Sequence, residues 1–173
     1  MPTFVSDLRT REGIAARALE FAVLCAARSG EVRGARWSEI DMVAGVWVVP
    51  AQRMKAGKEH RVPLSIQAMA LLKALPRATE SALVFDTNQG KPLSDMALTS
   101  VLRRMKVDAV PHGFRSTFRD WAGEMTNHPR EIAEQALAHA LESKVEAAYR
   151  RGDALEKRRA MMQDWADYCY PKV

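Results

Sequence analysis

The chain has 173 residues, a length suited to one domain, and 47% of them are hydrophobic, enough to form a core. The formal net charge of +5 favours a polyanionic partner, although many proteins without one are also mildly basic. Cys25 and Cys169 lie at opposite ends of the chain and indicate reduced thiols rather than a disulfide framework. Apolar runs are too short for a membrane span, and the N-terminus lacks a signal-peptide pattern. We therefore expect a soluble cytoplasmic protein.

The first third of the chain predicts two helices. In residues 11–27 the apolar side chains recur at helical spacing, and Thr10 is placed to cap the start. The helix is expected to stop near Ser29, and a second short helix to run from there to Ala35.

Residues 37–64 change character. The runs "WSEID", "GVWVVP" and "HRVPL" are short and rich in β-forming residues, and polar or turn residues separate them. They predict a small antiparallel sheet. The stretch "AQRMKAGKE" is then a hairpin tip between the last two strands, and it carries Arg53, Lys55 and Lys58.

The remainder of the chain predicts helices joined by loops, "TNQGKP" among the latter. The predicted caps and starting points are Ser65, Ser94, His112, Pro129, and a capping box made by Asp153 and Glu156. The expected fold is therefore mostly α with a small antiparallel β-sheet, in a single domain.

Two short stretches contain arginines suited to binding phosphate. In "PHGFR", His112 and Arg115 lie about one turn apart on one face, in the first turn of a helix where free N–H groups favour an anion. The same short motif is also consistent with a histidine that only caps the helix and an arginine that lies on the surface. In "AARSGEVRGARW", Glu31 could orient the guanidinium of Arg28, or Arg28 could simply neutralise a helix C-terminus.

Three further residues could act in catalysis. Lys55 on the hairpin tip could protonate a leaving oxygen, although a lone turn lysine is usually just solvated. His139 in "QALAHAL" falls near the apolar stripe of a helix, where border histidines are common. Tyr149 in "AAYRR" is a weak nucleophile unless cations stabilise its phenolate. Metal-ligand spacings and glycine-rich phosphate loops do not occur, so we expect no metal, cofactor or nucleotide.

Taken in chain order, these residues resemble the active-site set of the tyrosine recombinases, or phage integrases, in the branch found on prophages and genomic islands. The matching segments are "ARSGEVRGARWSEID", "MKAGKEHRVPLS", "HGFRSTFRDWAGE", "QALAHA" and "VEAAYRRGD…EKRRAMMQDWADY". They cover nearly the whole chain.

The resemblance implies a catalytic-domain fold that is mostly helical with a small sheet, and a role for each position. Tyr149 would be the nucleophile that makes a 3′-phosphotyrosine link. Arg28 and Arg115 would hold the phosphate, and Lys55 would act as the general acid. His112 and His139 would complete the catalytic set by donating hydrogen bonds to the phosphate oxygens or by assisting proton transfer. Glu31 would be a supporting residue beside the first arginine, and Arg53 and Lys58 would contact DNA.

The resemblance also implies partners and a domain organisation. The substrate would be double-stranded DNA at attachment sites, and the full-length enzyme would act in a synaptic tetramer without a metal. Family members carry N-terminal arm-binding and core-binding domains, and we expect residues 1–173 to be the catalytic domain alone. Two other functions stay open: a non-catalytic DNA-binding remnant, or nicking and resealing in the manner of a type IB topoisomerase. The last helix could dock in cis or on a neighbouring protomer.

Overall fold

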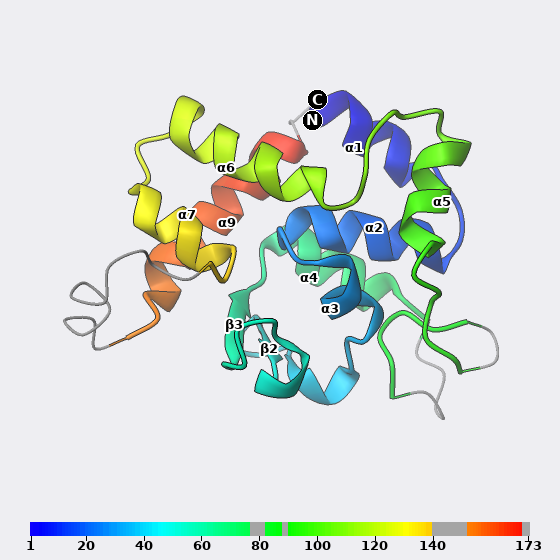
Figure 1. Ribbon diagram of the computed structural model, residues 1–173, viewed down its shortest axis with the longest axis horizontal. Coiled ribbons are helices and arrows are strands. Elements are labelled where there is room, and N and C mark those ends of the chain that lie inside the picture. The colour runs from blue at the N-terminus through cyan, green and yellow to red at the C-terminus, as the bar shows by residue number, and fades with distance from the viewer. Residues whose placement is uncertain (77–81, 88–89, 140–151, 171–173) are drawn as a thin grey trace.

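The computed structural model describes residues 1–76, 82–87, 90–139 and 152–170. Helices dominate these ranges, and a three-stranded sheet lies at one side of them (Figure 1). The helices are α1 (Pro2–Arg9), α2 (Ile14–Leu24), α3 (Ser29–Arg33), α4 (Ile66–Ala74), α5 (Ala97–Arg104), α6 (Gly113–Met125), α7 (Arg130–Ala136) and α9 (Leu155–Cys169). The predicted fold class is therefore confirmed. Within the described ranges, none of the helices combines the length and the apolarity needed to cross a membrane.

The sheet is antiparallel in the order β1 (Ile40–Asp41), β2 (Val46–Val49) and β3 (His60–Pro63), as predicted. The pairing sets Val49 of β2 opposite His60 of β3, directly after the hairpin tip closes. The first predicted strand is mostly a 3-10 turn and leaves only two residues for β1.

Helix α2 is the central element of the core (Figure 1). Most of its side chains are buried, and it contacts five other helices: α1, α3, α4, α5 and α9. Phe21 packs its ring 5.5 Å from Trp47 of the sheet and 5.3 Å from Phe85. A helix buried on nearly every side has little freedom to move, so the chain that follows α2 starts from a fixed position.

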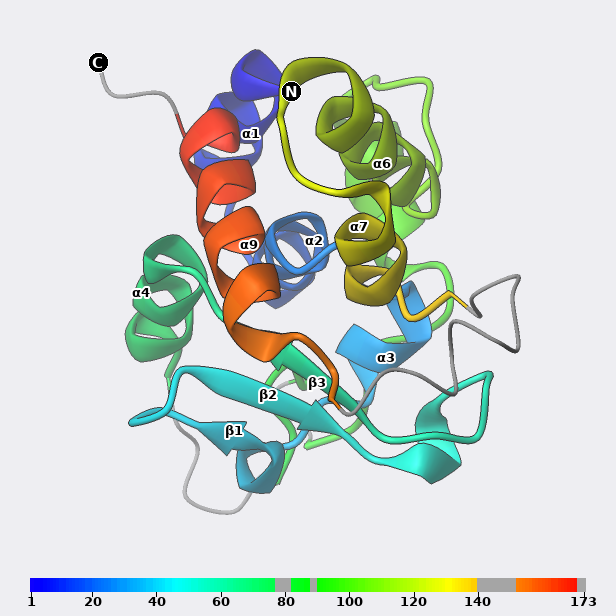
Figure 2. The same ribbon diagram turned by 90° about the vertical axis from the view of Figure 1, so that its left-hand side faces the viewer.

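Helix α9 packs on its own domain. It crosses α2 between α4 and α7 and starts beside β3 (Figure 2). Trp165 is fully buried, and its indole N–H donates to the carbonyl oxygen of Val23 at 2.8 Å. Its ring meets Phe118 edge-on at 5.4 Å and lies 5.1 Å from Trp121. The described chain therefore docks this helix in cis.

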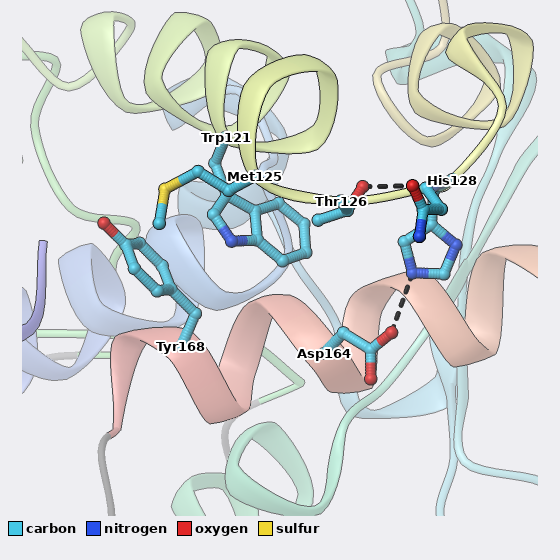
Figure 3. A pocket seen from close by; sticks show the side chains of 7 residues that line it. Trp121, Met125, Thr126, His128, Asp164 and Tyr168 are labelled. Atoms are coloured by element: carbon cyan, nitrogen blue, oxygen red, sulfur yellow. Dashed lines mark hydrogen bonds and ion pairs between the residues drawn. The ribbon is translucent and has the colours of Figure 1, made fainter.

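A polar contact and an open pocket flank the same helix. His128, in the turn after α6, lies 2.7 Å from a carboxylate oxygen of Asp164 on α9 (Figure 3). Beside this pair is a pocket of about 520 Å³ lined by Trp121, Met125, Thr126, Asn127, His128, Asp164 and Tyr168. The pair ties the α6–α7 turn to α9.

Several predicted caps were wrong, and one helix was not predicted. Helix α1 begins with Pro2 and buries Val5 and Leu8, a short amphipathic pattern that the sequence alone did not reveal. Thr10 does not cap α2: its hydroxyl donates to the carbonyl of Asp7, and Gly13 precedes the helix instead.

The other predicted caps divide between confirmed and wrong. Ser65 does cap α4, accepting from the backbone N–H of Ala68 at 3.2 Å. Ser94 does not cap α5, because that helix starts at Ala97 after Met96. The predicted capping box at α9 does not form: Ala154 is the cap residue, Asp153 pairs with two arginines, and Glu156 pairs with Arg159.

Candidate active site

Arg28 is fixed where the chain turns between α2 and α3. Ala26 has a positive φ of 47°, which ends the run of α2, and Arg28 then caps α3 in an extended conformation. Glu31 accepts twice from this residue, from the backbone N–H at 2.9 Å and from Nη1 of the guanidinium at 2.8 Å. Glu31 is only 5% exposed, so both bonds form in a shielded place where they are stronger than in water. The predicted orientation of Arg28 by Glu31 is observed.

Arg115 reaches the same place from α6. Its side chain is 3% exposed, and its guanidinium donates to the carbonyl oxygens of Ala26 and, at 2.6 Å, of Leu137. Burial first, and then the positive charge of Arg28, lower the pKa of Arg115 to about 10, while Glu31 opposes the shift. Arg115 therefore stays protonated at neutral pH, next to a second guanidinium.

His139 completes this group from the chain beyond α7. Helix α7 ends at Ala136, and Ala138 has a positive φ of 50°, so His139 lies past the helix and not on its apolar stripe as expected. Its Nε2 is 3.3 Å from Nη2 of Arg115, and its Nδ1 is 2.6 Å from Glu134. The Glu134 carboxylate makes Nδ1 the protonated nitrogen, which leaves Nε2 directed toward the arginine.

Glu134 is itself held in place. Arg119 donates to its other oxygen at 2.6 Å. Burial opposes ionisation of Glu134, but the hydrogen bonds from His139 and Arg119 outweigh burial and lower its pKa. A negative charge therefore persists behind His139.

His60 is a residue of this site that the sequence analysis did not identify. It occupies the start of β3, and its Nε2 lies 3.2 Å from the carbonyl oxygen of Ala136, one residue before the carbonyl that binds Arg115. Burial first, and then the charge of Arg158, lower the pKa of His60 to about 4, so the ring is neutral at pH 7 and donates from Nε2. A single histidine in "HRVPL" carries no spacing that could have signalled this contact.

The predicted basic residues of the hairpin tip differ in their surroundings. Lys55 and Lys58 are exposed. Arg53 instead turns inward and donates to the carbonyl of Glu31 at 2.9 Å while pairing with the carboxylate of Glu39. Arg53 therefore braces the Arg28 turn, and a DNA contact by it or by Lys58 stays a prediction.

His112 directly precedes α6, and its exposed side chain makes no capping hydrogen bond. Tyr149 lies outside the described residues. The structure thus brings Arg28, Glu31, Arg115 and His139 together, while Lys55 and His112 face solvent.

Comparison with known proteins decides the family. Residues 5–156 match the model of the phage integrase family. The chain belongs to the phage integrase family. The resemblance to the tyrosine recombinase catalytic domain is thereby confirmed.

Curated relatives within the phage integrase family agree. The prophage integrase IntA of Escherichia coli K12 is 35% identical over 174 residues, which cover 96% of this chain and 42% of the relative. The integrase of Enterobacteria phage P4 is 35% identical over 189 residues, which cover 96% of this chain and 43% of the relative. The prophage integrase IntZ of the same E. coli strain is 38% identical over 154 residues, which cover 87% of this chain and 38% of the relative. The chain thus spans less than half the length of these relatives. No solved structure matched.

The described residues of this phage integrase site offer cations rather than a cluster of metal ligands. The described side chains contain no group of three or more His, Cys, Asp or Glu that could hold a metal ion. They do contain two guanidinium groups and an imidazole converging at one place, which suits a phosphate diester. The expectation that the reaction needs no metal stays a prediction.

Proposed function

We propose that this chain is the catalytic domain of a site-specific DNA recombinase that cleaves and rejoins double-stranded DNA through Tyr149. The observation that carries the proposal is the meeting of Arg28, Arg115 and His139, which come from three separate parts of the chain. Two charged guanidinium groups in a partly shielded place bind a phosphate more strongly than they would in open water.

Each step of the reaction exchanges one phosphate ester bond for another, so no external energy source is needed. The Tyr149 oxygen attacks phosphorus, the bond from phosphorus to the 5′ oxygen breaks, and a 3′-phosphotyrosine forms. The phenol proton passes to one of the site histidines, His112 or His139, and the leaving 5′ oxygen takes a proton from Lys55. Attack by a 5′ hydroxyl of another strand reverses these steps and releases the tyrosine.

The cations supply the catalysis. The pentacoordinate phosphorus carries more negative charge on its non-bridging oxygens than the ground state does, and fixed positive groups stabilise it at no reorganisation cost. A guanidinium has five N–H groups, so Arg115 keeps donors for a phosphate after it binds Ala26 and Leu137. Those two carbonyls hold its planar fork in place before DNA arrives.

The proposal extends to partners and to the rest of the protein. The substrate is DNA at attachment sites, and the complete enzyme, bacterial or phage-encoded, assembles as a tetramer in the cytoplasm. Residues 1–173 act as the catalytic domain. Because most of its contacts are to phosphates, the isolated domain is expected to bind DNA weakly and with strong salt dependence.

A covalent-capture experiment tests the proposal. The 173-residue chain is incubated with nicked duplexes that carry a randomised central region, in which the short strand released by cleavage diffuses away and traps the adduct. We expect a protein–DNA adduct that disappears in Tyr149→Phe and falls at least 100-fold in Arg115→Ala.

The outcomes separate the candidate functions. Salt-sensitive binding without any adduct would make the chain a non-catalytic DNA-binding remnant. An adduct that is resealed on its original strand, and never joined to a second duplex, would indicate activity of the type IB topoisomerase kind. An adduct that persists in Tyr149→Phe would overturn the assignment of the nucleophile.

A further inference from the structure

Three residues form a closed set of contacts at the start of α9, which we call the Asp153 clasp: Arg61, Asp153 and Arg158. Arg61 donates to both carboxylate oxygens of Asp153, from Nε at 2.8 Å and from Nη2 at 2.7 Å. Arg158 donates from Nη2 to the same carboxylate at 2.8 Å and from Nε to the Asp153 carbonyl at 2.7 Å. Its Nη1 donates to the Arg61 carbonyl, so each residue binds the other two.

The clasp contains the buried positive charge of Arg158. Arg158 is 1% exposed, and all three of its guanidinium nitrogens donate within the clasp. A buried guanidinium is tolerated only when its charge and its N–H groups are matched, so removing its partner is costly. Arg61 and Asp153 are each about two-fifths exposed, at 44% and 38% of their side chains. Arg61 is therefore the member that can be substituted most safely, because its loss leaves the pairing of Arg158 with Asp153 in place.

The clasp adjoins the arginine site. His60 directly precedes Arg61 on β3, and the charges of Arg158 and of Arg115 both act on its ring. The half-buried His60 imidazole thus lies near both the clasp and the Arg28–Arg115 site. The same strand leads back to the hairpin tip, where Lys55 lies five residues before His60. Figure 2 shows the first turn of α9 beside β3.

We propose that the Asp153 clasp is a positioning device for Tyr149, an inference that rests on the proposed function. Tyr149 lies four positions before Asp153, so covalent geometry keeps their Cα atoms within about 14 Å of each other. The clasp fixes Asp153 to β3, the strand that follows the hairpin tip with Lys55. A nucleophile held near its target reacts much faster than one on a free tether, because the entropy of positioning is already lost. In this proposal Arg61, Asp153 and Arg158 are positioning residues, which act through Tyr149.

A distance measurement that needs no catalysis gives the first test. Spin labels are attached to Tyr149→Cys and to Val43→Cys, a fully exposed position in the β1–β2 turn. The native Cys25 and Cys169 are buried, and burial raises the pKa of both thiols, which keeps them unreactive. We expect the distribution of distances between the labels to widen at least twofold when Asp153→Asn or Arg61→Gln is added. Equal widths with and without the clasp would overturn the proposal.

The rate of adduct formation on the nicked duplexes gives the second test, in chains that keep Tyr149. We expect Asp153→Asn and Arg61→Gln to slow it by roughly 10- to 100-fold, with DNA affinity within about threefold. The double variant should be no slower than the slower single variant, because the residues act as one unit.

A matched control distinguishes the clasp from loss of an ordinary ion pair. Glu156→Gln breaks the exposed pair with Arg159, three residues further along the same helix, and should leave both the distances and the rate unchanged. Arg61→Gln retains the buried Arg158–Asp153 bonds and so separates positioning from unfolding. If the parent chain forms no adduct at all, the proposed function fails, and the distance test still decides whether the clasp positions residue 149.

Discussion

Arg115 and His139 meet with 3.3 Å between Nη2 and Nε2, although Arg115 lies on α6 and His139 follows α7, 24 residues further along the chain. The contact depends on the turn after α7, which places the Leu137 carbonyl and the His139 ring on the same guanidinium. Arg115 is therefore held by backbone on one side and by a catalytic candidate on the other. The predictions below test the residues that hold this site together.

Glu134→Gln should slow DNA cleavage without weakening DNA binding. The carboxylate fixes the tautomer and the orientation of His139 and carries the compensating charge behind it. The rate of adduct formation should fall roughly 10-fold or more, less than the 10²–10⁴ typical of a general acid–base group itself. Glu124→Gln, on the exposed face of α6, is the control and should react at the parent rate. Equal rates for both variants would refute the role of Glu134.

Glu31→Gln should destabilise the fold as well as the site. The substitution keeps the size of the side chain but removes the charge that accepts two bonds from Arg28 in a buried place. The free energy of unfolding should fall by about 1–3 kcal/mol, measured by urea denaturation at pH 7. Glu12→Gln, which is exposed, should change it by less than about 0.5 kcal/mol. An unchanged free energy of unfolding in Glu31→Gln would mean that Arg28 is held by other contacts.

His60 should make stability fall in mild acid. Its pKa is about 4 in the folded chain and 6.5 unperturbed, so between these values the unfolded state binds a proton that the native state does not. Titration of His60 therefore leaves stability unchanged above about pH 6.5 and lowers it as the pH falls toward 4, by up to about 3 kcal/mol. His60→Gln can still donate to Ala136 but does not titrate. Urea denaturation at pH 7.5 and at pH 4.5 should show a smaller loss in the variant than in the parent, and equal losses would contradict the assignment.

Trp165→Ala should show that α9 stabilises its own domain. The fully buried ring contacts Phe118 and Trp121 and donates to Val23, and its removal should cost about 3–5 kcal/mol of unfolding free energy. Lys157→Ala, exposed on the same helix, is the control. The midpoint of thermal unfolding should also be independent of protein concentration. A midpoint that rises with concentration would mean that the helix docks between copies.

Local pattern was sufficient for the type of most elements but not for their ends. Apolar spacing and β-rich runs identified α2 and the β2–β3 hairpin, because both depend on the chain's own periodicity. Where a helix ends depends on whether a side chain that could cap it binds the helix or another group. Thr10 and Asp153 have the chemistry of caps, but each found a partner elsewhere, Asp7 in one case and two arginines in the other.

By itself the sequence determined the residue types of the site and their order: Arg28, Glu31, Arg115 and His139 could all be named from short motifs and a family resemblance. Only the tertiary structure decided what holds them. The carbonyls of Ala26 and Leu137, the carboxylate of Glu134, the ring of His60 and the Asp153 clasp have no sequence signature. The physical reason is that backbone carbonyls are present at every position, and which of them meets a buried guanidinium depends on how distant segments pack.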